Sequence, residues 1–162
     1  MPSNTVPGPA TGPPTTVAVP TITTYLQKGD MATTEIWTTY AEVKSIDGPS
    51  MSNTWHDTTS HSNPDKFRRG IVVLNDVGDI NFELNFIPTN ATHNYATGML
   101  GDYVNGTLIH LRMAWPDNAL IASRTNYAFY GYFIKFNFGA PVDGVATAKV
   151  SFKATGPPAF SA

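Results

Sequence analysis

The sequence contains no cysteine and comparatively few charged residues. Without cysteine, disulfide bonds and thiolate metal sites are excluded. Charged residues make up 14% of the chain, whereas about a quarter is usual in globular proteins. Such a composition leaves polar but uncharged surface, which is easily buried in a contact between subunits.

The chain also lacks a strong charge of either sign and any long apolar run. Its formal net charge is -2, so there is no basic surface to hold nucleic-acid phosphates. No apolar run approaches the roughly 20 residues of a membrane helix. The beginning, MPSNTVPGPATGPP, has neither the basic start nor the apolar core of a secretory signal. We therefore expect a soluble, unexported protein of one domain that does not enter a membrane.

Catalytic and metal-binding patterns are missing as well. There is no Gly-x-Ser-x-Gly turn, no phosphate-binding loop and no dinucleotide fingerprint. His56 and His61, with Asp57 and Asp65 nearby, could gather a metal, but their spacing matches no established site. Hydrogen-bonding loop side chains are the simpler interpretation. Two further histidines are single and expected to be structural: His93 and His110. The sequence predicts no enzyme, no metal and no cofactor.

Prolines are concentrated at the N-terminus. Proline removes a backbone donor and fixes φ, so residues 1–20 can form neither a helix nor a central strand. This stretch is either an extended, adaptable arm or a loose terminus, and composition alone favours the second. We divide the chain into an arm (1–20), a β domain (21–158) and a short tail (159–162). The prolines of the arm are Pro2, Pro7, Pro9, Pro13, Pro14 and Pro20.

Alternation of apolar and polar residues dominates the rest of the chain. Residues 79–88 read DINFELNFIP, in which every second residue is apolar. This pattern is typical of a half-buried strand. The stretch 127–138 is so aromatic that we expect burial on both faces at its start. The other expected strands cover residues 21–26, 35–44, 108–115 and 145–154.

Only one segment has helical spacing. Thr89 or Asn90 can cap it, because a short oxygen-bearing side chain binds a free N–H of the first turn. The pair Asn105–Gly106 supplies a left-handed stop. Two internal glycines weaken the helix by about 1 kcal/mol each, so it must pack on a sheet. The sequence therefore predicts a mainly β protein: a sandwich or barrel of about seven strands with one helix packed on it.

The segment 47–69 follows neither pattern. A loop of about 20 residues is either functional or disordered. It carries three large apolar residues, Met51, Trp55 and Phe67, which a purely solvated loop has little reason to keep. Either Trp55 folds back on its own domain, or the loop lies on another subunit.

The order of five phrases carries a resemblance to a known family. They are VKSIDGPSMSNTWHDTTSHSNP, GDINFELNFIP, LIHLRMAWPD, FYGYFIKFNFG and AKVSFKATGPP. In this order and spacing, covering about residues 36–158, the chain resembles the major tail-tube proteins of long-tailed, non-contractile bacteriophages such as phage lambda. The tube protein of type VI secretion shares the family's sandwich.

This resemblance implies an assembly. In the family, six subunits join their sheets edge to edge into a ring, rings stack, and the long loop and N-terminal arm reach neighbouring subunits. The corresponding contact residues here would be Pro7, Pro13, Pro14, Met51, Trp55, His56, Phe67 and Arg68. The family's lumen tends to be acidic, which keeps phosphates from sticking. The candidates for that face are Asp79, Asn81 and Glu83.

The resemblance also implies partners and a location. The partners would be a tape-measure protein and tail-tip and terminator proteins, and DNA would pass through the lumen without specific binding. The subunit would assemble in the host cytoplasm and end in the tail of the virion. One alternative is the tube protein of a type VI-like or phage-like contractile particle. Another is a carbohydrate-binding β-sandwich with Trp37, Trp55 or Trp115 as sugar platforms.

Overall fold

The computed structural model describes residues 23–62, 64 and 67–161. Within them the chain forms nine strands, one α-helix and a short 3₁₀ helix over Ile121–Ser123. The mainly β class with a single helix is therefore confirmed. In chain order the elements are β1 (Tyr25–Gly29), β2 (Trp37–Thr39), β3 (Val43–Asp47), β4 (Ser52–Asp57), β5 (Gly70–Asp76), β6 (Asp79–Asn85), α1 (Met99–Asn105), β7 (Ile109–Ala114), β8 (Asn126–Gly139) and β9 (Thr147–Ser161).

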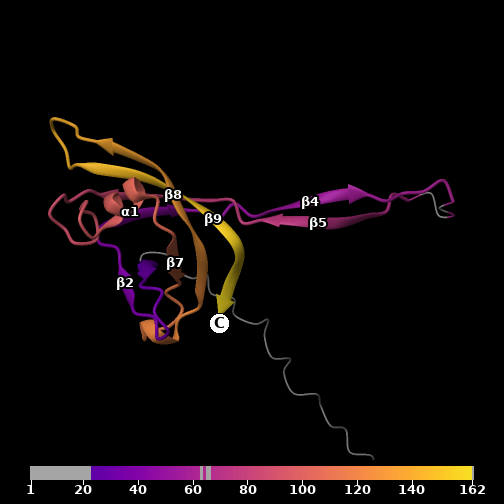
Figure 1. Cartoon of the computed structure of the whole chain (residues 1–162), viewed down its shortest axis with the longest axis horizontal. Coiled ribbons are helices and arrows are strands. Elements are labelled where there is room, and N and C mark those ends of the chain that lie inside the picture. Colours follow the sequence, from indigo (N-terminus) through magenta and orange to yellow (C-terminus); the bar gives the residue numbers. More distant parts are fainter. Residues whose placement is uncertain (1–22, 63, 65–66, 162) are drawn as a thin grey trace, which may run out of the picture.

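Seven strands form one curved antiparallel sheet in the order β2-β1-β7-β8-β9-β6-β3 (Figure 1). The sheet curls so far that its two edges approach each other. The two edge strands, β2 and β3, are joined by residues 40–42 alone. The body is thus a barrel that is almost closed, with its apolar core inside the curl.

The core is built from the inward-facing residues of the central strands. On β6, Ile80, Phe82 and Leu84 are buried, as the alternating pattern predicts. Each fully buried side chain of this size contributes about 1.5–3 kcal/mol. They pack in one cluster with residues of the other strands and of α1, including Leu26, Met99, Ile109, Leu111, Phe129, Phe133, Val150 and Phe152.

The helix is shorter than predicted. It begins at Met99 rather than near residue 90, and residues 88–97 form successive turns. Asn94 explains the difference, because its side-chain oxygen accepts the N–H groups of Thr97 and Gly98 at 2.9 and 3.0 Å. Those bonds compete with the helical backbone pattern. The predicted stop is confirmed, since Gly106 is left-handed with φ 60°.

Two predicted strands at the start of the body have different bounds. The prediction of one strand over 35–44 is wrong, because the backbone turns at Ala41 and Glu42 and separates β2 from β3. Glu42 has a positive φ of 57°, which an extended strand does not allow. The first strand begins at Tyr25, and residues 21 and 22 lie outside the described part.

The two long strands β8 and β9 also differ from expectation. Tyr130 and Tyr132 are exposed, so the prediction that β8 starts with both faces buried is wrong. Among the described residues no second sheet or helix covers these two side chains, which are 43% and 42% exposed. Strand β9 does not end at residue 154 but continues to Ser161. Gly156, with φ 77°, lies in an irregularity of the pairing that accommodates the following prolines.

Candidate assembly surfaces

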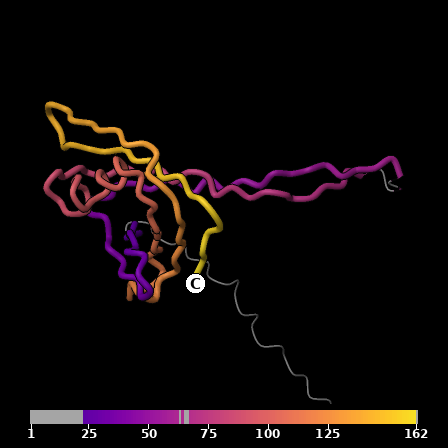
Figure 2. Tube along the Cα trace, in the orientation of Figure 1, coloured from indigo at the N-terminus to yellow at the C-terminus, as the bar shows by residue number. Residues whose placement is uncertain are grey.

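Strands β4 and β5 form a separate two-stranded ribbon that extends far from the body (Figures 1 and 2). The prediction of a loop over 47–69 is therefore wrong in part, because residues 52–57 are a strand paired with residues 70–76. The sequence did not predict strand β4 for two reasons. Strand β4 reads SNTWHD, with one large apolar residue, and a bulge shifts the register between Thr54 and Trp55.

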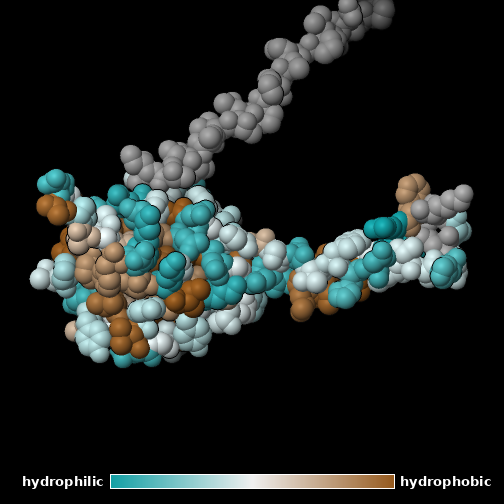
Figure 3. All heavy atoms as spheres, turned by 90° about the horizontal axis from the view of Figure 1, so that it is seen from above, coloured by the Kyte–Doolittle hydropathy of each residue, from teal (hydrophilic) through white to brown (hydrophobic). Residues whose placement is uncertain are grey.

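The ribbon exposes apolar side chains on strand β5. Four apolar residues follow one another there: Ile71, Val72, Val73 and Leu74. The side chain of Leu74 is 67% exposed. A two-stranded ribbon has no second layer to cover such residues and is marginally stable by itself in water. Apolar residues are accordingly visible along the ribbon in the space-filling view (Figure 3). This surface has the character of a contact site.

Trp55 lies on the ribbon and is 61% exposed. Its indole covers Gly70 on the paired strand, where an added Cβ would lie 2.2 Å from the ring. The alternative that Trp55 folds back on the body is therefore not what the structure shows. The side chain belongs to the surface of the ribbon.

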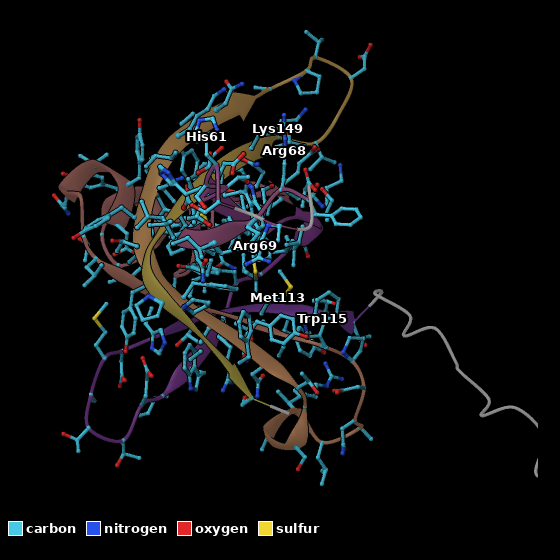
Figure 4. The ribbon with its side chains drawn as sticks, turned by 90° about the vertical axis from the view of Figure 1, so that its right-hand side faces the viewer. His61, Arg68, Arg69, Met113, Trp115 and Lys149 are labelled. Carbon is cyan, nitrogen blue, oxygen red and sulfur yellow. The ribbon has the colours of Figure 1, made fainter. Side chains whose placement is uncertain are left out.

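The other predicted contact residues lie on the same projecting segment. Met51, His56 and Arg68 are exposed, and Phe67 is 75% exposed. Figure 4, which looks along the ribbon toward the body, labels three residues of this segment: His61, Arg68 and Arg69. The predicted contacts Pro7, Pro13 and Pro14 lie outside the described residues. Whether any of these residues touches a second subunit stays a prediction.

The residues considered as metal ligands and set aside were His56, Asp57, His61 and Asp65. Within the described part of the chain, no group of three or more His, Asp or Glu side chains is placed to hold a metal ion. Asp65 falls outside that part. His56 and Asp57 are neighbours on β4, so their side chains alternate across the ribbon.

The long strand β8 pairs with β7 along only part of one edge, and α1 packs against β8 with 5.9 Å between the ring centroids of Tyr103 and Phe136. Strand β7 pairs with β8 only up to Gly131. Beyond it, residues 132–139 pair with β9 on one side and with no described strand on the other. Strand β3 is likewise the outermost strand of the sheet. Open edges present free N–H and C=O groups to a further strand.

The predicted lumen residues lie together on the outer face of β6, opposite β9. Asn81 accepts a hydrogen bond from the Ser151 hydroxyl at 2.6 Å. Each acid has a lysine nearby: Asp79 Oδ1 lies 3.3 Å from Lys153 Nζ, and Glu83 Oε1 lies 3.2 Å from Lys44 Nζ. The face is therefore charge-paired, and these residues do not make it acidic. Sequence reasoning missed the lysines because they belong to β3 and β9, whose pairing with β6 was unknown.

Lys153 is held by two acids rather than one. Besides Asp79, its ammonium lies 3.4 Å from Asp76 Oδ2. Both carboxylates raise the pKa of Lys153 above its ordinary value, Asp79 most strongly, and partial desolvation opposes them. The lysine therefore stays charged at neutral pH and neutralises part of the acidic charge beside it.

A second cluster covers the outer face of β1, β2, β7 and β8. The His110 ring stacks on Tyr130 at 4.0 Å between ring centroids, and its other side meets Trp37 at 4.8 Å. Glu35 lies 2.6 Å from His110 Nδ1. Arg112 places its guanidinium 4.1 Å from the Trp37 ring centre. Trp37 is thus covered by protein groups, which argues against its use as an open sugar platform.

His93 is completely buried and both of its ring nitrogens are bonded. Nδ1 accepts the backbone N–H of Ile87 at 3.1 Å, and Nε2 donates to the carbonyl of Ala41 at 2.8 Å. This arrangement fixes the neutral tautomer. The prediction of a structural role for His93 is confirmed.

Comparison with solved structures identifies proteins of similar fold. A chain from the tail of an empty gene transfer agent particle, refined with C6 symmetry, has a TM-score of 0.64 and 16% identity. The match covers 85% of this protein and 96% of that chain. A chain from the virion of the native gene transfer agent has a TM-score of 0.62 and 15% identity, with 85% and 95% coverage.

Two further matches come from an injection system and a prophage baseplate. A chain from the sheath/tube terminator structure of an extracellular contractile injection system, PVC, has a TM-score of 0.66 and 10% identity, with 91% and 99% coverage. A chain from the baseplate structure of the anti-feeding prophage has a TM-score of 0.61 and 6% identity, with 90% and 97% coverage. No protein-family model and no curated protein matches the sequence.

Because the sequence identities are 16% or lower, these matches establish the fold alone. The chain has the fold found in tails and phage-like particles, which agrees with the fold that the resemblance implied. A specific relationship to the lambda-type tube proteins stays a prediction. None of the helices in the described part of the chain has the length and apolar content needed to cross a membrane.

Proposed function

We propose that the protein is a structural, non-enzymatic subunit of a phage-like tail, whose copies form hexameric rings stacked into a tube. The observation that carries this proposal is the projecting β4–β5 ribbon with its exposed apolar side chains. A fold shared with chains of a tail particle of C6 symmetry supports it.

Burial of the apolar side chains of the ribbon would favour assembly. Leu74 and its apolar neighbours on β5 are exposed in the isolated subunit, and a neighbouring copy would remove them from water. Burial of apolar area contributes roughly 25 cal/mol per Å². Predicted contacts such as Met51, Trp55 and Phe67 lie on the same projecting segment and would share this contact.

The open sheet edges supply a way to close a ring. Residues 132–139 of β8 and the outer side of β3 each lack a strand neighbour among the described residues. Pairing of one edge with another edge of the next copy would satisfy these backbone groups. Because the two edges are different surfaces, the contact is heterologous and closes into a ring when the rotation fits.

The outer face of β6 is the proposed lining of the tube. Its acids are paired with lysines, and Asn81 and Ser151 add neutral polar groups. A face without excess positive charge gives DNA phosphates little to hold. DNA would therefore slide through toward the host cell. Assembly around a tape-measure protein, with tip and terminator proteins at the ends, and a final place in the virion belong to the same proposal.

A tube inside a contractile particle is the second candidate. It is favoured by the similarity to a chain from an extracellular contractile injection system. The subunit would play the same part in both kinds of tube. The difference would be a sheath around the tube and a cargo other than DNA.

The test is assembly of the purified protein. We expect negative-stain images of concentrated or seeded protein to show rings or tubes of uniform bore. Leu74→Lys should abolish them while the free energy of unfolding of the subunit changes by less than about 0.5 kcal/mol, because the residue is exposed. Asn53→Lys, an exposed polar position of the same ribbon, is the matched control. A protein that stays monomeric in every condition, or binds a glycan array instead, would contradict the proposal.

A further inference from the structure

The ribbon joins the body at two neighbouring strands of the sheet (Figure 1). Strand β4 follows β3, strand β5 precedes β6, and β3 and β6 pair with each other. Between body and ribbon the chain runs through residues 48–51 on one side and residues 77 and 78 on the other. We call these two connections the ribbon junction. Because they differ in length, the ribbon is not a simple continuation of the β3–β6 pair.

The two connections of the junction lie close against the chain opposite them. Gly78 has a φ of 74°, and an added Cβ there would lie 2.2 Å from the carbonyl oxygen of Ser50. Gly48 has a φ of 109°, and its Cβ would lie 2.6 Å from the carbonyl oxygen of Asp79. Glycine alone allows both the left-handed backbone and this approach. In addition, Ser50 donates its backbone N–H to the carbonyl of Asp79 at 3.3 Å. The junction is therefore closely packed.

The side of the junction that follows β5 is anchored in the body. Val77 is buried and belongs to the core cluster. The carbonyl of Gly78 accepts the backbone N–H of Ala154, a residue of β9, at 3.4 Å. Both contacts lie within two residues of the end of β5, so the ribbon has little freedom to pivot there.

Lys153 of β9 connects the ribbon to the body across this junction. Its ammonium lies between Asp76, the last residue of β5, and Asp79, the first residue of β6, at 3.4 and 3.3 Å. The second carboxylate oxygen of Asp76 accepts the backbone N–H of Gly78 at 2.9 Å. This bond and the neighbouring lysine hold the pKa of Asp76 below its ordinary value, so the carboxylate is charged at neutral pH. One cation thus bridges two acids on opposite sides of the junction.

We propose that the junction is rigid and that Lys153, by bridging Asp76 and Asp79, fixes the direction in which the ribbon projects from the separate subunit. A single exposed ion pair adds little to the stability of a fold. Here, however, the lysine has two partners and acts at the base of the ribbon, where a small rotation displaces the far end most. A ribbon whose direction is fixed beforehand loses less conformational freedom when a partner binds it. The inference goes beyond the proposed function, because it concerns a property of the monomer.

Pulsed electron double resonance measures this direction as a distribution of distances within one chain. The sequence has no cysteine, so spin labels can be attached to Ser60→Cys, beyond β4, and Ala159→Cys, near the end of β9; both positions are exposed. Labelled chains are diluted with unlabelled protein so that distances between copies do not contribute. We expect one narrow distribution for this doubly labelled chain.

Lys153→Met in the same labelled chain should widen the distribution to at least about 1.5 times its original width, because the bridge across the junction is lost. Lys149→Met is the matched control: it removes the same charge from an exposed position of the same strand and should leave the width unchanged. Lys153→Arg should restore the narrow distribution. Circular dichroism checks that each variant keeps its β-sheet signal.

Salt gives a second result that needs no substitution. At 1 M salt the screening length falls to about 3 Å, so the distribution of the chain with Lys153 should widen, whereas that of Lys153→Met should not change. A distribution that is already broad with Lys153 present, one that stays narrow in Lys153→Met, or equal widening by Lys149→Met would overturn the proposal. None of these results bears on tube formation, and a failure to form tubes would leave the measured distances unchanged, so the two proposals can fail separately.

Discussion

Single residues inside the curl differ in how their polar groups are satisfied. His93 has both ring nitrogens bonded to backbone groups. The Tyr40 hydroxyl is buried and has no hydrogen-bond partner among the described residues. Burial raises the pKa of Tyr40 well above its ordinary value, with the nearby Asp102 charge adding to the effect. The hydroxyl therefore stays protonated, and its cost is that of an unpaired buried group.

Tyr40→Phe tests this account. It removes the unpaired hydroxyl and keeps the ring that packs edge-on against Phe133 at 6.4 Å. We expect the free energy of unfolding in urea to stay the same or to rise by up to about 1 kcal/mol. His93→Ala is the contrast, because it leaves two backbone groups unpaired, and it should lower stability by about 2–4 kcal/mol. A clear loss of stability in Tyr40→Phe would reveal a hydrogen bond that the structure does not show.

Asp117 gives a prediction for acid pH. Its carboxylate accepts bonds from the Thr125 hydroxyl and backbone N–H, which lower its pKa below the ordinary value. A carboxyl whose pKa is lower in the folded state stabilises the fold above its unfolded pKa of about 3.9. That contribution is lost as pH falls from about 4 toward the folded pKa. Asp117→Asn should therefore flatten the loss of stability between pH 5 and pH 3, as measured by urea unfolding at each pH. An unchanged slope would contradict this role, and Asp143→Asn on an exposed turn is the control.

At the scale of elements, the strands with a covered face were the ones that sequence could predict. The alternation of β6 reports burial on one face, and Ile80, Phe82 and Leu84 are indeed buried. The ribbon β4–β5 has no covered face, so its residues carry no alternation that burial would impose. On the candidate assembly surface, the apolar residues Met51 and Trp55 could be identified from the sequence as candidate contacts. The ion pairs on β6 could not, because they depend on strand order.

The extended end of β9 is a second element that sequence missed. Phe160 lies opposite Tyr127 of β8, with 4.9 Å between the ring centroids, although prolines precede it in the chain. Phe160→Ala should lower the free energy of unfolding by about 1–2 kcal/mol, because the side chain is half exposed and its ring contact is lost. Val142→Ala, at a fully exposed position, should change it by less than about 0.5 kcal/mol. Equal stability of the two variants would argue that β9 ends earlier.

At the scale of the whole molecule, the curled sheet differs from the β4–β5 ribbon and the N-terminal segment. The curled sheet is stabilised by its own core, whereas no residue of the ribbon strands β4 and β5 belongs to that core cluster. The N-terminal segment is rich in proline and contributes no predicted strand. Under the proposed function, the curled sheet would fold alone, and the ribbon and the N-terminal segment would be left for contacts with other copies.

Deletion of residues 2–18 tests this division. We expect a folded monomer with an unchanged β-sheet signal in circular dichroism, because the core cluster is formed by residues from 26 onward. Growth of rings or tubes should be impaired, as seen by negative stain and sedimentation. An unfolded product would show that the segment belongs to the core rather than to the assembly.

Electron cryomicroscopy of the assembled protein tests the central claim most directly. The account predicts stacked rings of six copies around a common bore, with the β4–β5 ribbon of each copy lying against another copy and Leu74 removed from solvent. A particle in which the ribbon remains in solvent, or an assembly without a continuous bore, would contradict it.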